Sequence, residues 1–319
     1  MGNNFNIQPP DKDLREKALK VRNASNEISQ SSDEERKNAL SCMADSLVNN
    51  SDKILQANVN DIEYAKENGI SQSLLARLKL TRDKLDLGIE GVRKVGNLTD
   101  PIGQIQINKE LSNGLILQRK TVPIGVLGVI FESRPDAVMQ ISSLAIRSGN
   151  GVILKGGSES NQTNIAIIKA LHEGLEESSL NKDSICLLTN RKDSIAMLNL
   201  EKDINLIIPR GSNELVKFIQ KNTRIPVLGH ADGICHLFID NCCDIDLGIK
   251  VSLDSKIQYP AACNAIETLL IHKDVASEFL SKAIPVFKAN KVELRGDEKS
   301  TKYGIKLSAS NKDWETEYL

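Results

Sequence analysis

The stretch VPIGVLGVIF, residues 122–131, is an apolar run, and a polar segment beginning at Glu132 follows it directly. Beyond that segment, apolar residues recur at helical spacing, at Ala137, Val138, Ile141, Leu144 and Ala145. A glycine-containing turn at residues 148–151 stops the predicted helix, and a second short apolar run starts at Val152. Apolar runs that alternate with amphipathic helices indicate βαβ units and a parallel sheet buried on both faces.

The same alternation extends toward the C-terminus. Further strands are predicted at 185–188, 204–208, 225–228, 235–239 and 266–271, with helices between them. A helix that starts near Val275 is predicted to end near Pro285, because proline interrupts helical hydrogen bonding. We therefore predict an α/β fold with a domain boundary near Leu228, dividing residues 1–228 from residues 229–319.

The part that precedes residue 122 has a different pattern. Up to about residue 96 it is helical, and Ser32 with Glu35 forms a capping box at one helix start. These helices are rich in charge and are predicted to form a solvated outer layer. Residues 101–120 alternate around Asn113-Gly114, which predicts a β-hairpin.

Composition excludes several classes of function. The chain has 319 residues, 41 basic and 42 acidic, and only 3% of them are aromatic. This balance favours neither nucleic acid nor an anionic membrane as a partner, and no apolar run approaches the length of a membrane span. A long chain with six cysteines and no signal peptide has the reduced-thiol pattern of a cytoplasmic protein.

Cys263 is the candidate nucleophile. It lies among small residues in YPAACNAIETLLIH, residues 259–272, directly before an apolar run. A thiolate is a strong nucleophile, and neighbouring backbone N–H groups can stabilise an oxyanion. The alternative is a free cysteine that serves as a small core residue.

Three loops after predicted strands are candidates for ligand binding, because parallel sheets bind ligands at the carboxyl ends of their strands. Ser133 and Arg134 precede a helix and could hold an anion, or could belong to an ordinary capped helix with a solvated arginine. The loop Lys155-Gly156-Gly157-Ser158 lets a ligand approach the backbone, although it matches neither the Walker nor the Rossmann glycine pattern. Gly211 and Ser212 repeat this arrangement after another strand.

A zinc site is the alternative function for the histidines and cysteines between residues 230 and 243. The set is His230, Cys235, His236, Cys242 and Cys243. Their spacings match no C-x-x-C or H-x-x-x-H pattern, so no metal is expected.

Five motifs resemble those of the gamma-glutamyl phosphate reductases, in the order that this family has them. They are VPIGVLGVIFESRPDAVMQ, SGNGVILKGGSES, IPRGSNELV, IPVLGHADGICH and YPAACNAIETLLIHK. The chain is especially similar to the reductase half of the bifunctional delta-1-pyrroline-5-carboxylate synthases, within the aldehyde dehydrogenase superfamily. The resemblance implies a Rossmann-like NADPH-binding domain, an α/β catalytic domain and a β-flap for oligomerisation, which begins at the hairpin near residues 101–120.

The resemblance also implies a reaction: NADPH-dependent reduction of L-glutamyl 5-phosphate to glutamate 5-semialdehyde, the second step of proline biosynthesis from glutamate. Cys263 is then the nucleophile, with Ser133 assisting at the oxyanion and Arg134 holding the leaving phosphate. Lys155, with the adjoining Gly156, Gly157 and Ser158, is implied to contact the cofactor ribose region, and Gly211 with Ser212 its pyrophosphate. The implied partners are a second copy of the chain and glutamate 5-kinase.

The sequence departs from the family pattern at two points. Residues 227–231, VLGHA, lack the glutamate with which aldehyde-oxidising dehydrogenases activate water, which favours a reductase. Family members continue past the point where these residues stop, so we expect a catalytic domain that is truncated at its C-terminus. The alternatives are a non-catalytic subunit that binds nucleotide or a full-length partner and, less favoured, an aldehyde-oxidising enzyme.

Overall fold

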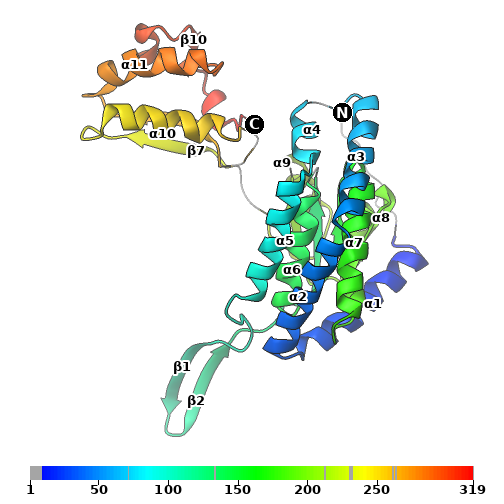
Figure 1. Ribbon diagram of the computed structural model, residues 1–319. Coiled ribbons are helices and arrows are strands. Elements are labelled where there is room, and N and C mark those ends of the chain that lie inside the picture. Colours follow the sequence, from blue (N-terminus) through cyan, green and yellow to red (C-terminus); the bar gives the residue numbers. More distant parts are fainter. Residues whose placement is uncertain are drawn as a thin grey trace. The chain divides into compact units, whose positions relative to one another are not determined.

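The computed structural model describes residues 9–70, 72–132, 134–211, 213–229, 233–260, 262 and 264–318. The chain divides into two compact units, Met1–Gly229 and His230–Leu319 (Figure 1). The boundary predicted near Leu228 lies beside this division. In the described part of the chain, every helix is too short or too polar to cross a membrane.

A four-stranded parallel sheet forms the centre of the first unit, in the order β5-β4-β3-β6. The strands are β3 (Val126–Phe131), β4 (Gly151–Lys155), β5 (Ile185–Leu187) and β6 (Leu206–Arg210). All residues of β3 and β4 are buried, as the continuous apolar runs predict. The prediction of a strand at 225–228 is wrong. Val227 forms only an isolated bridge with Ile207, because Pro226 has no N–H with which to extend the ladder of hydrogen bonds.

Helices cover both faces of this sheet, and alternate residues of β3 face each layer. One layer consists of α6 (Asp136–Arg147) and α7 (Asn161–Glu176), and the other of α1 (Lys12–Ser29), α8 (Arg191–Ala196) and α9 (Asn213–Lys221). Leu127, Val129 and Phe131 belong to one core with α6 and α7, whereas Val126 and Ile130 belong to a second core with α1 and α9. The parallel α/β prediction is therefore confirmed.

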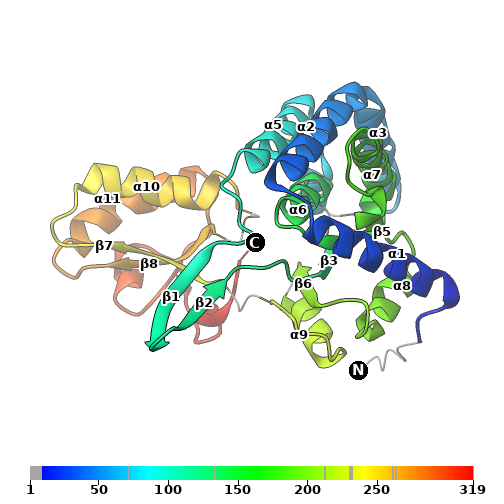
Figure 2. The same ribbon diagram turned by 90° about the horizontal axis from the view of Figure 1, so that it is seen from below.

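A third layer of helices packs outside α6 and α7 (Figure 2). It consists of α2 (Asp33–Asn49), α3 (Ser51–Glu67), α4 (Gln72–Leu78) and α5 (Arg82–Gly96). The capping box is confirmed, since the Ser32 hydroxyl accepts from the Glu35 N–H and the Glu35 carboxylate accepts from the Ser32 N–H. The predicted solvated layer is correct only for the outer faces, because Leu40, Met43 and Leu47 are fully buried. These three residues form an apolar stripe that packs on α7. The many charged residues of the same helices suggested a solvated layer and did not indicate that this stripe is buried.

Two buried arginines fix the segment that follows α5. Arg36 is 1% exposed and donates to both carboxylate oxygens of Asp100 at 2.8 Å. Arg147 is 2% exposed; it donates to the Asp33 carboxylate and to the Leu98 carbonyl. Both bonds to Asp100 come from the same Arg36 nitrogen, Nη2. Since hydrogen bonds between charged groups are stronger than neutral ones, the two arginines hold residues 98–100 firmly where the chain leaves the helical layer.

The predicted hairpin follows this segment and is confirmed. Strand β1 (Ile105–Ser112) pairs antiparallel with β2 (Leu115–Lys120), and Gly114 has φ +82° in the connecting turn (Figure 1). Every residue of both strands is exposed. Six of these exposed residues are large and apolar: Ile105, Ile107, Leu111, Leu115, Ile116 and Leu117. Both faces of the ribbon are thus without a covering layer among the described residues.

The second unit is a smaller α/β structure. Strands β7 (Cys235–Ile239) and β8 (Ile266–Ile271) are parallel and are connected by α10 (Ile245–Ile257). The core of this unit includes Phe279 and other residues of α11 (Ala276–Ala289). The predicted helix end near Pro285 is wrong, because α11 continues to Ala289 and keeps Ala283 and Phe287 buried. Burial of the apolar stripe outweighs the cost of the proline in this helix. Two strands of two residues each, β9 (Arg295–Gly296) and β10 (Leu307–Ser308), pair with each other and complete the unit.

Candidate active site

The carboxyl edge of the four-stranded sheet brings together three of the predicted loops. Strand β3 lies between β4 and β6, so the loops after Phe131, Lys155 and Arg210 are neighbours. The Glu132 N–H donates to the Arg210 carbonyl at 3.2 Å and fastens two of them to each other. Arg134 is exposed on the first loop. This edge is where a parallel α/β sheet binds its ligand.

Four residues named in the sequence analysis lie outside the described part of the chain: Ser133, Ser212, Cys263 and, from the alternative zinc set, His230. Ser133 and Ser212 adjoin described residues of the first unit, whereas the neighbours of Cys263 belong to the second. The structure therefore brings together Arg134, the Lys155–Ser158 loop and Gly211.

The Lys155 loop is closely packed against the helix that follows it. Lys155 is 7% exposed, and its ammonium donates to the Gly156 carbonyl. A Cβ at Gly156 would lie 2.3 Å from Asn164 Nδ2 and 3.0 Å from the Phe131 ring, so a larger residue does not fit. Asn164 is 1% exposed, and its Oδ1 atom has no hydrogen-bond partner within the described part of the chain. Sequence reasoning gave no role to this residue, because a lone asparagine in a helix gives no functional signal.

The Gly211 loop is restricted less firmly. A Cβ at Gly211 would lie 2.6 Å from the Glu132 carboxylate and 2.8 Å from a methyl group of Leu215, and both atoms are ends of side chains. The loops after β3 and β6 are joined instead by the backbone hydrogen bond from Glu132 to Arg210. Glu132 was also missed as a site residue, although it follows β3 directly in the sequence.

The N-terminus of α7 is closed by a carboxylate from the outer layer. Asp61 of α3 accepts hydrogen bonds from the backbone N–H of Gln162 at 3.2 Å and of Thr163 at 2.8 Å. It also accepts from the Thr163 hydroxyl at 2.6 Å. Asp61 is 3% exposed, so its negative charge already occupies the position where a helix N-terminus attracts an anion. No sequence signal connects Asp61 with a helix about a hundred residues later.

The thiols of the first unit are poor nucleophiles. Burial raises the pKa of Cys186 to about 11 and also raises the pKa of Cys42. Both side chains therefore stay protonated at neutral pH, and the thiol is far less reactive than the thiolate. Among the described residues, no group of three or more His, Cys, Asp and Glu side chains is arranged to bind a metal ion.

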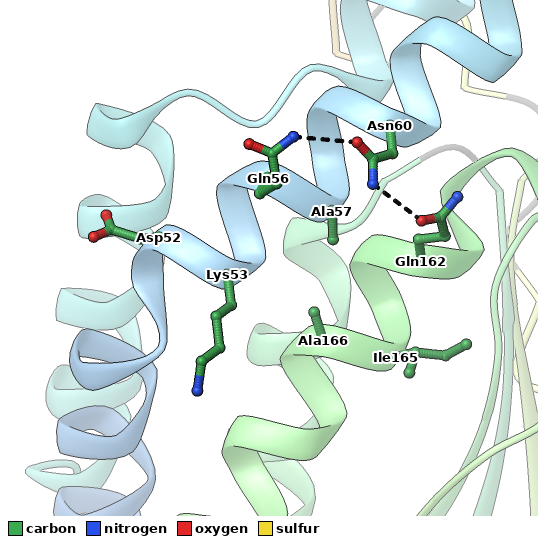
Figure 3. Close-up of a pocket in the computed structure, with 8 residues that line it drawn as sticks. All are labelled: Asp52, Lys53, Gln56, Ala57, Asn60, Gln162, Ile165 and Ala166. Carbon is green, nitrogen blue, oxygen red and sulfur yellow. Dashed lines mark hydrogen bonds between the residues drawn. The ribbon is translucent and has the colours of Figure 1, made fainter.

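A groove of about 610 Å³ lies on the outer surface between α3 and α7 (Figure 3). At its upper end, Gln56 donates to Asn60 along α3 at 3.2 Å, and Asn60 donates across the groove to Gln162 of α7 at 3.3 Å. Apolar atoms of Ala57, Ile165 and Ala166 contribute to its lining. None of the predicted site residues lines this groove, so the chemistry is better assigned to the carboxyl edge than to this hollow.

Comparison with known proteins gives a consistent result. The model of the aldehyde dehydrogenase family matches residues 10–319. A gamma-glutamyl phosphate reductase from Prochlorococcus marinus strain MIT 9301 is 69% identical over 319 residues, which are 100% of this chain and 73% of that relative. The chain belongs to the gamma-glutamyl phosphate reductase family. It is thus an oxidoreductase of the aldehyde dehydrogenase superfamily.

Solved structures of the reductase family have the same fold. The Thermotoga maritima gamma-glutamyl phosphate reductase is 36% identical, with a TM-score of 0.88 over 96% of this chain and 74% of the other. The Saccharomyces cerevisiae gamma-glutamyl phosphate reductase is 37% identical, with a TM-score of 0.65 over 92% of this chain and 74% of the other. An engineered glycolyl-CoA reductase with bound NADP+ shares only the fold, at 14% identity and a TM-score of 0.64.

Proposed function

We propose that the protein catalyses the NADPH-dependent reduction of L-glutamyl 5-phosphate to L-glutamate 5-semialdehyde, with release of phosphate. The observation that carries this proposal is the 66–69% identity to gamma-glutamyl phosphate reductases across almost the whole chain. The arrangement of the carboxyl edge supports it, since three loops with small or cationic residues meet there. A place in proline biosynthesis follows from this reaction.

The proposed chemistry depends on Cys263. Its thiolate attacks the acyl carbon of the substrate, the bond from that carbon to the phosphate oxygen breaks, and phosphate leaves. This exchange leaves a thioester on Cys263. NADPH, when bound, supplies the hydride that reduces the acyl group. Collapse of the resulting thiohemiacetal breaks the carbon–sulfur bond, which frees the aldehyde and regenerates the thiol.

The residues at the carboxyl edge fit a dinucleotide. Gly156 and Gly211 carry no side chain at the ends of their strands, and Lys155 supplies a cation beside Gly156. Because the Asp61 carboxylate blocks the N-terminus of α7, the pyrophosphate is better assigned to the loop of Gly211 and Ser212. Lys155, with Gly157 and Ser158, is assigned to the ribose region. Arg134 is exposed and remains the candidate for the leaving phosphate, with Ser133 at the oxyanion.

The proposed reaction can be tested in reverse, since glutamyl phosphate is too labile to supply. We expect the chain to form NADPH from glutamate 5-semialdehyde, NADP+ and phosphate, with a rate that depends on phosphate. NADPH formation is followed by absorbance, with phosphate omitted as the control. Equal rates with and without phosphate would instead identify an aldehyde-oxidising dehydrogenase. A folded chain that binds NADPH without turnover would identify a non-catalytic subunit.

We also propose that the hairpin mediates homo-oligomerisation. Its apolar side chains, such as Leu115 (57% exposed) and Leu117 (47% exposed), have no covering layer in the chain. Exposed strand edges and apolar faces of this kind favour pairing with another copy. Contact with glutamate 5-kinase is proposed on the family resemblance. A cytoplasmic location is supported by the free thiols of the five described cysteines.

Charges on the hairpin should weaken the oligomer. In a Leu115→Asp/Leu117→Asp double variant, two carboxylates would have to be buried in an apolar contact, so the dissociation constant is expected to rise at least about tenfold. Sedimentation velocity over a range of protein concentrations measures this constant. Gln118→Asp, on the same strand at a polar position, should have a much smaller effect. An unchanged association constant in the double variant would argue against the hairpin as the interface.

A further inference from the structure

Lys256 lies in the last turn of α10, seven residues before Cys263 in the sequence. Its ammonium donates to the Ile266 carbonyl at 2.9 Å, to the Glu267 carboxylate at 3.1 Å and to the Tyr318 carbonyl at 3.3 Å. An ammonium group has three N–H donors. Three protein acceptors therefore use the whole hydrogen-bonding capacity of Lys256.

The acidic partner in this contact is deeply buried. The side chain of Glu267 is 2% exposed and that of Lys256 is 21% exposed. A buried carboxylate that loses its cation carries a large desolvation penalty, so such a pair resists separation. Lys282 of α11, in the same unit, pairs with Glu278 at 3.0 Å and with Asp246 of α10 at 3.6 Å. These three side chains are 48%, 60% and 79% exposed, so the desolvation penalty that holds the Lys256–Glu267 pair together does not apply to them.

The pair connects the two ends of one loop. Helix α10 ends at Ile257 and strand β8 starts at Ile266, so Lys256 is bonded across residues 258–265 to the first two residues of the strand. Backbone hydrogen bonds from Ala262 to Tyr259 and from Ala265 to Ala262, both 3.0 Å, fold the chain between these ends. The loop is closed at its base by a cation whose protons are all engaged.

We propose that the Lys256–Glu267 ion pair is a positioning device for the loop that carries Cys263. The inference rests on the proposed role of Cys263 as the nucleophile. Lys256 is a positioning residue rather than a group that touches substrate, because its three donors are already bonded within the protein. Closing the base holds the two described ends of the loop together, and small misplacements of reacting groups reduce turnover strongly.

The test compares Lys256→Met with Lys256→Arg and with Lys282→Met as the matched control. Methionine keeps much of the side-chain length and removes the ammonium. In the reverse reaction we expect kcat of Lys256→Met to fall by about 30-fold or more, as for a displaced nucleophile. KM for NADP+ should stay within about twofold, because the proposed cofactor loops belong to the other unit. Lys256→Arg should recover part of kcat, and Lys282→Met should retain it.

A second variant covers the case in which an unpaired Glu267 prevents folding. Lys256→Met/Glu267→Gln removes both charges and leaves no buried ion alone, and it should show the same split between kcat and KM. An unchanged kcat in either folded variant, or a parallel rise in KM for NADP+, overturns the proposal.

Hydrogen exchange tests the positioning role of Lys256 independently of whether the chain catalyses the proposed reaction. The amides of Ala262 and Ala265 should exchange at least about tenfold faster in Lys256→Met than in the wild-type chain, because the base of the loop is open. This comparison needs no turnover. If the wild-type chain lacks the reverse reaction, the proposed function fails and exchange alone decides: unchanged protection overturns the positioning role, and faster exchange confined to this loop supports it.

Discussion

A Cys263→Ala variant is expected to lose phosphate-dependent NADPH formation by a factor of at least about 10⁴. Without the thiolate, no acyl-enzyme forms and the bond to phosphate is not broken. Cys186 does not substitute, because its raised pKa keeps that side chain protonated at neutral pH. NADPH binding should persist, since the proposed cofactor loops lie in the first unit.

The measurement is the initial rate of the reverse reaction, together with a fluorescence titration of NADPH. Cys242→Ala is the matched control, because Cys242 is an exposed cysteine of the same unit. It should keep the wild-type rate. Comparable rates in the Cys263→Ala and Cys242→Ala variants would rule out Cys263 as the nucleophile.

The second large effect is expected at Asp100, through the stability of the first unit. In Asp100→Ala the buried Arg36 guanidinium loses a carboxylate that accepts two hydrogen bonds at 2.8 Å. An unpaired buried charge of this kind destabilises a protein by about 3 kcal/mol. Opening of α2 should therefore become about a hundred times more frequent.

Hydrogen exchange of peptides from α2, read by mass spectrometry, reports this local opening even though the chain has two units. Asp52→Ala is the control: Asp52 pairs with Arg82, but its side chain is 92% exposed. Removal of such a surface pair costs only about 0–1 kcal/mol. Equal protection of α2 in the two variants would show that the Arg36–Asp100 pair contributes no more than a surface pair.

Local patterns predicted much of the fold because their causes are local. The Ser32–Glu35 capping box and the Asn113-Gly114 turn depend on residues a few positions apart, and both are found in the structure. The parallel sheet was predictable because strands buried on both faces need continuous apolar runs. The helix that continues through Pro285 was not, since its stability comes from packing of Phe287 in the core of the second unit.

The candidate site was predictable only in part, for a similar reason. Lys155 and Gly211 follow apolar strands, so their meeting at one sheet edge could be inferred from the parallel topology. The role of Asp61 could not, because its partners on α7 are distant in the sequence. The Lys256–Glu267 pair also required the structure, since no short-range pattern shows which residues the end of a crossover helix will meet.

The Asp61 contact has a consequence for how the first unit folds. The carboxylate precedes its N–H donors on α7 by about a hundred residues, so the cap forms only after a long loop has closed. Until then the first turn of α7 has unsatisfied amides and the carboxylate stays hydrated. Docking of the outer helices and completion of α7 are therefore one cooperative event, and α7 is expected to fray at its start in any fragment that lacks residues 9–70.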